Sequence, residues 1–215
     1  MRWCWTVVVA GLAACSGTPT NPTSGMPTVL TIDLRSGAWE TISDPQPYPL
    51  ATNATNQLTF DLPSSGAINY LFTTSPQLQI RGNVIVRFSI VSTGPVVFNS
   101  LDPISGGCVI PTSVRPFIWA NANGNGEYDR WWSNPASAPL KDGTATIGVP
   151  LSPEAWSSVN GKFGNANAET KYNFARAILN VSRLGVTFGG GCSFGHGVNV
   201  SGGQAQFVLT ELAIR

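Results

Sequence analysis

The chain has 215 residues, of which 11% are charged and 42% are hydrophobic. This balance excludes a disordered acidic or basic tail and a protein with several membrane spans. The formal net charge is +1, so the composition gives no reason to expect nucleic acid as a partner. The 23 glycines and 16 prolines favour short strands joined by many turns. We therefore expect one globular domain with an additional segment, and we assign no oligomeric state.

Residues 1–14 have the pattern of an export signal. Arg2 precedes the apolar stretch 3–14, which is too short to cross a bilayer as a mature helix. The stretch ends in Leu12-Ala13-Ala14-Cys15, which resembles the lipobox of bacterial lipoproteins. The resemblance implies a lipid on Cys15 and, because Ser16 rather than Asp follows, anchoring in the outer membrane. The alternative is an ordinary secretory signal that is cleaved after Ala14.

Residues 15–27 are predicted to form a lipidated cysteine and a flexible tether, and residues 28–215 the folded domain. The tether sequence lacks charge and almost lacks apolar side chains, so it cannot bury a core. Once Cys4 leaves with the signal and Cys15 carries lipid, only Cys108 and Cys192 remain. An exported protein favours a disulfide between them, with a chain-entropy stabilisation of about 4 to 5 kcal/mol. The alternative is two separate free thiols or a pair of metal ligands, for which the sequence lacks the clustered His, Cys or carboxylates that a metal site needs.

The folded part shows the period-two alternation of β-strands. Apolar and polar residues alternate through 84–90, which predicts a strand with one buried face. Further strands are predicted at 29–34, 58–62, 68–72, 114–120, 144–149, 184–188 and 205–214. Turns rich in Gly, Pro and Ser separate these segments. The sequence therefore predicts an all-β fold, an antiparallel β-sandwich with one or two short helices.

Two segments interrupt the strand pattern. Ser152 precedes Pro153 and an acidic residue, which predicts an N-cap and a short helix over 153–159, with Trp156 turned inward. A longer helix is predicted over 169–180, where apolar residues recur at helical spacing. Such an apolar stripe is expected to cover the end or side of a sandwich.

The order of elements after Trp156 resembles the last part of galactose-binding-like jelly rolls, which are common in non-catalytic carbohydrate-binding modules. The resemblance rests on the strand at 180–188 and the long terminal strand at 205–214. The chain is also similar to a group of export-signal-bearing bacterial proteins without an assigned activity. The shared motifs are Arg115-Pro116-Phe117, Arg130-Trp131-Trp132-Ser133 and the run FGGGCSFGHGV at 188–198. The resemblance implies a jelly-roll fold.

An asparagine-rich loop is a candidate calcium site. It places oxygen-bearing side chains at Asn121, Asn123, Asn125 and Asp129, the spacing with which acidic loops wrap Ca²⁺. Three of these ligands are neutral, and Trp132 stands where such loops carry a bidentate Glu. The alternative is a Gly/Asn turn that binds no ion, and otherwise no cofactor is predicted.

Aromatic residues next to this loop form the candidate ligand-binding region. These residues are Trp119, Tyr128, Trp131 and Trp132, with Arg130 among them. If residues 130–133 are extended, one of the two adjacent indoles faces the core and the other faces away. An exposed indole beside polar side chains suits sugar recognition, because sugar C–H faces stack on aromatic rings. The alternative is that both indoles close the rim of the sandwich, with Arg130 stacked on one of them.

The glycine-rich run 188–198 holds the chain's one histidine, His196, which joins the list of candidate ligand-binding residues. The sequence has no nucleophile elbow and no His-rich metal motif, so a non-enzymatic protein is expected. We therefore predict an outer-membrane lipoprotein with a non-catalytic, carbohydrate-binding domain. The alternatives are a structural or assembly lipoprotein of the cell envelope and, less favoured, a hydrolase acting on glycans.

Overall fold

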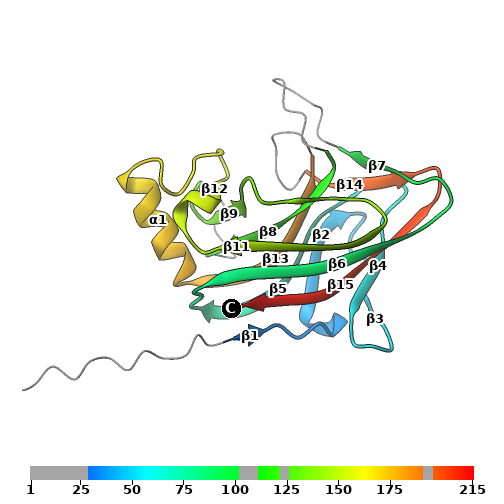
Figure 1. Cartoon of the computed structure of the whole chain (residues 1–215), viewed down its shortest axis with the longest axis horizontal. Coiled ribbons are helices and arrows are strands. Elements are labelled where there is room, and N and C mark those ends of the chain that lie inside the picture. Colours follow the sequence, from blue (N-terminus) through cyan, green and yellow to red (C-terminus); the bar gives the residue numbers. More distant parts are fainter. Residues whose placement is uncertain (1–28, 102–110, 122–125, 191–195) are drawn as a thin grey trace, which may run out of the picture.

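Two antiparallel sheets pack face to face in the computed structural model, which describes residues 29–101, 111–121, 126–190 and 196–215. Within these residues sheet A contains six strands and sheet B nine. Sheet A consists of β11 (Gly143–Pro150), β6 (Asn83–Thr93), β15 (Gln204–Ile214), β4 (Leu58–Asp61) and β3 (Ala51–Thr52), with β1 (Leu30–Thr31) paired to β15. Its strands β11, β6 and β15 cross the front of the molecule in Figure 1.

Sheet B lies behind these strands and carries the features discussed below. In order across the sheet, its strands are β12 (Trp156–Ser158), β9 (Arg130–Ser133), β8 (Ser113–Trp119), β13 (Val181–Gly189), β5 (Ala67–Leu78), β14 (Val198–Ser201) and β7 (Val97–Ser100). In addition, β10 (Ala138–Pro139) pairs with β8, and β2 (Trp39–Asp44) pairs with β5. The chain passes repeatedly between the two sheets, which is the jelly-roll arrangement predicted from the sequence.

The core lies between the sheets and follows from the alternation of each strand. In β6, Val84, Val86, Phe88 and Ile90 are buried, and the residues between them are more exposed. From sheet B, Leu71, Ile118 and Val186 point into the same core. We call this side of each sheet its inner face and the opposite side its outer face.

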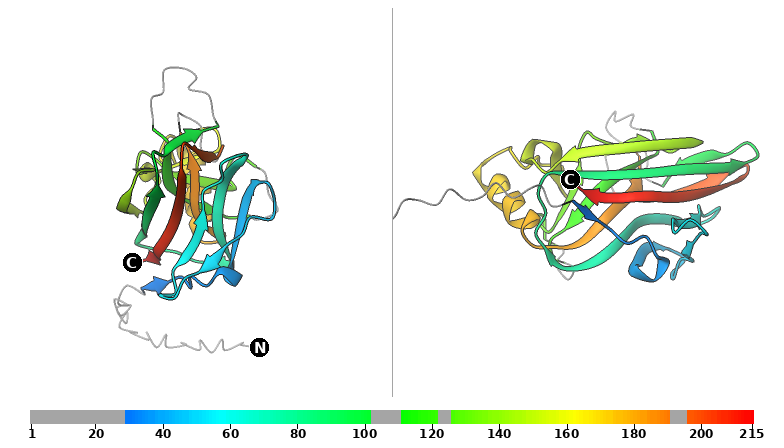
Figure 2. Two further views of the ribbon diagram at one scale, coloured as in Figure 1. Left: turned by 90° about the vertical axis from the view of Figure 1, so that its right-hand side faces the viewer. Right: turned by 60° about the horizontal axis from the view of Figure 1, so that its bottom comes forward.

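One helix, α1 (Ala168–Ile178), covers one end of the sandwich (Figures 1 and 2). Its N-terminus is fixed by a capping box, in which the Asn167 side chain accepts from the Thr170 main-chain N–H and the Thr170 hydroxyl accepts from Asn167 N–H. Phe174 and Ala177 are buried against the core, as the helical spacing predicted. In the described part of the chain, no helix has the length and apolarity needed to cross a membrane.

The structure corrects some expected elements. The helix expected over 153–159 is a single 3-10 turn, η2 (Pro153–Ala155), and Ser152 makes no capping hydrogen bond from its side chain. The chain then extends into β12, whose pairing with β9 places Trp156 opposite Ser133 in the core. A second 3-10 turn, η1 (Ser36–Ala38), and strands β2, β3, β7, β10, β12 and β14 were not predicted, whereas β9 confirms that residues 130–133 are extended. These strands are short, irregular or bounded by weak patterns, so tertiary pairing rather than alternation defines them.

Candidate functional site

The two adjacent tryptophans of β9 lie on opposite faces of sheet B. Trp131 faces inward, where its ring packs edge-on against Phe174 with centroids 5.2 Å apart, and its side chain is 0% exposed. Its indole N–H donates to the main-chain oxygen of Tyr128 at 2.9 Å. Trp132 faces outward, but it is also buried. The opposite orientation of the two indoles is as predicted, and their burial matches the alternative in which both close the rim of the sandwich, not the exposed indole that suits sugar recognition.

Trp132 belongs to a second group of buried rings, separate from the core between the sheets. We call this group the outer cluster; its members are Tyr70, Phe72, Phe117, Trp119 and Trp132. They come from three strands, β5, β8 and β9, and β13 lies between β5 and β8 without contributing a ring. No member is more than 6% exposed. An aromatic layer on the outer face is not needed to build the core of a sandwich, whose outer positions are usually polar.

Phe117 is the centre of the outer cluster. Its ring lies 5.0 Å from that of Tyr70 and 6.3 Å from that of Phe72, both in edge-to-face geometry. In the sheet, Phe117 pairs with Trp132 on one side and with Gly185 on the other. Gly185 lies between Phe117 of β8 and Phe72 of β5 in the sheet. Because Gly185 has no side chain, the rings of Phe72 and Phe117 meet over it.

Gly185 also marks a close approach of two backbones. A Cβ at this position would lie 2.0 Å from the main-chain oxygen of Leu71 and 2.7 Å from Cα of Phe72. Glycine within a strand has this role where another backbone comes near. The outer cluster therefore depends on a glycine that sequence alternation alone did not single out.

Two arginines cover the outer cluster. Arg130 and Arg183 pair with Trp119 from the strands on its two sides, so the three residues form one row across the sheet. The Arg130 guanidinium lies 5.2 Å from the Trp119 ring centroid and 5.8 Å from that of Trp132. The Arg183 guanidinium lies 4.5 Å from the Trp119 centroid and 4.7 Å from that of Phe72. Both distances from Trp119 are within the range of cation–π interactions.

Neither guanidinium forms an ion pair with a carboxylate of the described residues. The Nε atom of each is a buried donor without a hydrogen-bond partner. Both side chains are partly exposed, so they form much of the surface above the rings. A β-bulge between Val181 and Arg183 alters the direction of the chain at this point.

Burial shifts the pKa of two further side chains on this face, Tyr70 and Arg115. Burial raises the pKa of the Tyr70 hydroxyl, and the nearby positive charge of Arg130 partly offsets the shift. Burial also lowers the pKa of Arg115 to about 10. Its guanidinium donates to the main-chain oxygen of Ser133 at 3.4 Å. At neutral pH the face therefore combines a neutral phenol with positively charged guanidinium groups.

The predicted calcium loop connects β8 to β9 and begins directly beside Trp119 and Arg130. Its candidate ligands Asn123 and Asn125 lie outside the described residues, so the calcium prediction remains open. Asn121 is exposed, and the Asp129 carboxylate accepts from the Gly126 main-chain N–H at 2.8 Å. Elsewhere in the described chain, no three His, Cys, Asp or Glu side chains cluster as metal ligands.

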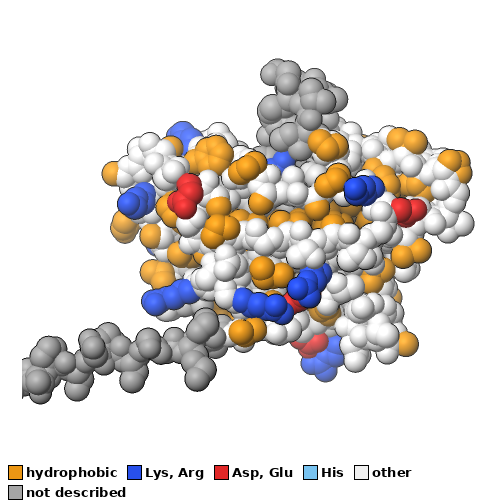
Figure 3. All heavy atoms as spheres, viewed as in Figure 1, with side chains coloured by type: hydrophobic (Ala, Val, Ile, Leu, Met, Phe, Trp, Pro, Cys, Tyr) orange, Lys and Arg blue, Asp and Glu red, His pale blue; other side chains and the backbone are white. Residues whose placement is uncertain are grey.

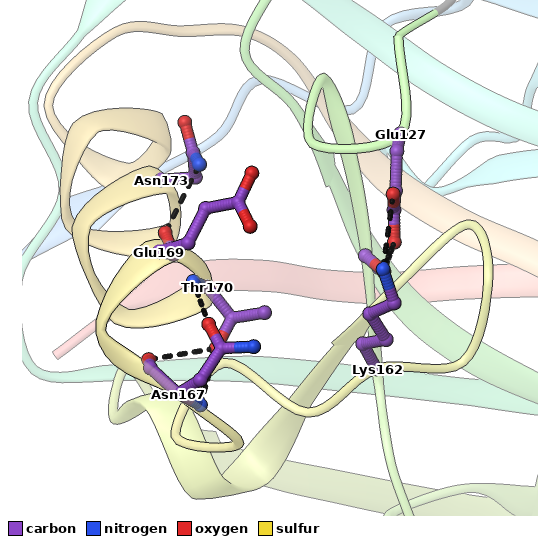
Figure 4. Close-up of polar contacts among 7 residues, drawn as sticks. Glu127, Lys162, Asn167, Glu169, Thr170 and Asn173 are labelled. Carbon is purple, nitrogen blue, oxygen red and sulfur yellow. Dashed lines mark hydrogen bonds and ion pairs between the residues drawn. The ribbon is translucent and has the colours of Figure 1, made fainter.

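An ion pair ties this loop to the segment before α1. Lys162 lies 3.0 Å from the Glu127 carboxylate, and the two side chains face each other in Figure 4. The hydrogen bond and charge of Glu127 raise the pKa of Lys162. The same figure shows the capping box of α1 across from this pair, with Asn167 beside Thr170. Glu127 therefore links the loop between β8 and β9 to the segment between β12 and α1.

The remaining predicted site residues are not brought to the outer cluster. Tyr128 stacks on Trp131, with ring centroids 6.0 Å apart, and so packs against the inner core. His196 is exposed, and the next residue, Gly197, donates to the main-chain oxygen of Phe188 at 3.1 Å. Phe188 pairs with Val114, which is about 17 Å along β8 from Trp119 at the usual strand rise. Cys15, Cys108 and Cys192 lie outside the described residues, so the lipid and disulfide predictions remain predictions.

A hollow of about 340 Å³ lies elsewhere, between the start of β15 and the segment after β2. Its aromatic lining residue is Tyr48, whose hydroxyl donates to the main-chain oxygen of Asp61 at 2.7 Å. Burial, with a smaller effect of the Asp61 charge, raises the pKa of Tyr48 to about 12. The described lining residues include no Lys or Arg, so this hollow lacks the combination of rings and cations found on sheet B.

Comparison with known proteins identifies no family. No protein-family model matches the chain, and no curated protein matches it. Among solved structures, it is similar to a family 11 carbohydrate-binding module from Clostridium thermocellum in complex with a β-1,3-1,4-mixed-linked tetrasaccharide. The identity is 12%, with 86% of this chain and 94% of that chain covered and a TM-score of 0.44. It is also similar to a xylan-binding module, CBM15, at 10% identity, with 86% and 98% covered and a TM-score of 0.40.

Proposed function

We propose that this protein is a non-catalytic recognition domain that binds carbohydrate on the outer face of sheet B. The observation that carries the proposal is the outer cluster, which is separate from the core and is covered by two partly exposed arginines. The buried rings hold the guanidinium groups in place by cation–π contacts, and guanidinium groups donate hydrogen bonds to sugar oxygens. The combination of both on one sheet face supports the proposal.

We also propose that the domain is anchored to the outer membrane through a lipid on Cys15. This part of the proposal rests on the lipobox-like Leu12-Ala13-Ala14-Cys15 and on Ser16. Several acyl chains on one residue make a firm anchor, since each buried methylene contributes about 0.8 kcal/mol. Labelling of cells with a radioactive fatty acid tests it: wild type is expected to carry label in the membrane fraction, and Cys15→Ser is expected to carry none. Label on the Cys15→Ser variant would contradict the proposal.

Carbohydrate binding is tested with the full chain purified in detergent. Tryptophan fluorescence is followed during titration with a panel of neutral and acidic polysaccharides, once with Ca²⁺ and once with a chelator. Trp119 and Trp132 lie in the outer cluster, so a ligand on this face is expected to shift their emission. Loss of the shift in chelator alone would show that the asparagine-rich loop requires an ion.

Variants locate the binding surface. Trp119→Phe and Trp132→Phe keep a ring in the outer cluster but reduce the ring surface that holds Arg130 and Arg183, and both are expected to weaken binding. Trp156→Phe is the matched control, because Trp156 is buried on the inner face. Near-ultraviolet circular dichroism confirms folding of each variant. Binding that survives both outer-face changes but is lost in the control, or no binding by folded wild type, would overturn the proposal.

A role in envelope assembly without sugar binding is the second candidate. The observation that favours it is the low exposure of the outer cluster, whose rings are as buried as a core. In that case the rings stabilise the domain rather than meet a ligand. The wild-type protein would then be folded and would show no change in tryptophan fluorescence with any polysaccharide of the panel.

A further inference from the structure

The row Arg130–Trp119–Arg183 carries two positive charges on one ring. Each guanidinium carbon lies within 5.2 Å of the Trp119 centroid, so the two charges are no farther apart than about twice that distance. At such a separation like charges repel each other unless solvent or an anion screens them. A partner of opposite charge would relieve this repulsion.

The described carboxylates do not supply that partner. Arg35, Arg87 and Arg215 each pair with an Asp or Glu, whereas Arg130 and Arg183 pair with none among the described residues. On the neighbouring edge of this face, Glu40 instead accepts a hydrogen bond from the Thr74 hydroxyl at 3.1 Å. Arg81 and Arg176 have no such partner among the described residues either, so what distinguishes Arg130 and Arg183 is that both stack on one ring.

Stacking leaves the hydrogen-bonding edge of a guanidinium free. The interaction with a ring uses the flat face of the group, and its N–H donors lie in the plane of that face. For Arg130 and Arg183 the Nε donor is itself buried without a partner, so the donors available to a ligand are the terminal N–H groups of these partly exposed side chains. The planar fork of such donors matches a carboxylate or another oxyanion in bidentate geometry.

We infer that the outer face of sheet B recognises saccharides that carry an oxyanion, and that Arg130 and Arg183 bind it. This inference rests on the proposed function and specifies its ligand class. The rings of the outer cluster hold the two guanidinium groups in place, and the groups offer their donors to a carboxylate or sulfate on the sugar. A neutral sugar would leave both charges uncompensated.

Matched polysaccharide pairs test the inference with the full chain in detergent. Polygalacturonate is compared with its methyl ester, which has the same sugar but no charge, and dextran sulfate is compared with dextran. We expect the protein to bind the acidic member of at least one pair about tenfold or more tightly, with weaker binding as NaCl is raised. The two pairs distinguish a carboxylate from a sulfate ligand.

Arginine variants distinguish binding at Arg130 and Arg183 from non-specific attraction between a positively charged protein and an acidic polysaccharide. Arg183→Gln and Arg130→Gln are each expected to weaken binding about tenfold or more, because each removes charge-assisted hydrogen bonds. Arg183→Lys is expected to restore only part of the loss, since lysine lacks the planar fork. Arg87→Gln is the matched control; it removes the same charge from the outer face of sheet A, where Arg87 pairs with Glu211.

The outcomes separate this inference from the proposed function. If the charged and uncharged polysaccharides of each pair bind equally, and Arg183→Gln and Arg130→Gln change neither affinity, the inference is overturned. The proposed carbohydrate-binding function would still stand. A loss in Arg87→Gln as large as in Arg183→Gln would also overturn it, because net charge would then explain the attraction. Binding to no polysaccharide at all would overturn both.

Discussion

The outer faces of the two sheets follow the same alternation but carry different side chains. On sheet A, outer positions such as Ser89 and Thr146 are small and polar, and Arg87 forms a 3.1 Å ion pair with Glu211. Basic and acidic side chains lie next to each other on the side of the molecule that Figure 3 shows. On sheet B, the corresponding positions hold five buried rings and two arginines without a described carboxylate partner.

The difference shows that the outer face of sheet A is an ordinary polar surface, whereas that of sheet B is an aromatic layer covered by two arginines. An outer face needs only polar side chains that water can hydrate. Guanidinium groups lose hydration when they are withdrawn from water, whereas burial of the rings is favourable, so the two charges are the part of this face that gains from a compensating partner. A ligand is the partner that we propose.

The largest difference is expected between matched truncations on the two outer faces. Phe117→Ala removes a ring that is 0% exposed and should destabilise the domain by about 3 to 5 kcal/mol. Thr146→Ala, on the exposed outer side of β11, should change stability by no more than about 0.5 kcal/mol. Urea unfolding followed by circular dichroism measures both. Similar losses in the two variants would remove the distinction between the faces.

An intermediate difference is expected between two glycines. Gly185→Ala places a methyl group against the backbone of β5, so it should cost about 1 to 3 kcal/mol or more and disturb the outer cluster. Gly148→Ala on β11 meets only the end of the Ile85 side chain, at 3.4 Å, and should be nearly neutral. Thermal unfolding compares the two variants. A Gly185→Ala protein as stable as wild type would show that the backbones separate easily.

The smallest difference is expected between Arg183→Gln and Arg87→Gln without ligand. The first loses cation–π contacts worth about 0.5 to 1 kcal/mol. The second loses a partly exposed ion pair worth about 0 to 1 kcal/mol, and Glu211 keeps its contact with Arg215. Both variants should therefore unfold within about 1 kcal/mol of wild type, measured in urea. A much larger loss for Arg183→Gln would favour a purely structural role of that side chain.

Part of the candidate site could be predicted from the sequence. The segment 130–133 indicated that Trp131 and Trp132 point to opposite faces, and the structure confirms it. Trp119 and Arg130 were included because they stand near the asparagine-rich loop. The placement of Arg130 on two rings matches the alternative in which the indoles close the rim of the sandwich.

Other members of the site could not be found this way. Tyr70, Phe72, Phe117 and Arg183 fall within predicted strands, but none was predicted as a member of the site. The signal was present in the alternation of β5 and β8, whose outer positions hold rings instead of polar residues. Alternation identifies which residues share a face of one strand, but it does not identify the neighbouring strand.

The sequence by itself determined the strand-rich composition, most long strands, the helix α1 and the two-sided nature of β9. These features depend on local spacing and on residues close in the chain, which hydrophobic periodicity and capping specify directly. Only the tertiary structure decided that β5, β8, β9 and β13 lie side by side and that Gly185 lets rings from β5 and β8 meet. That decision depends on pairing between distant segments, because the outer cluster exists only when four strands come into register.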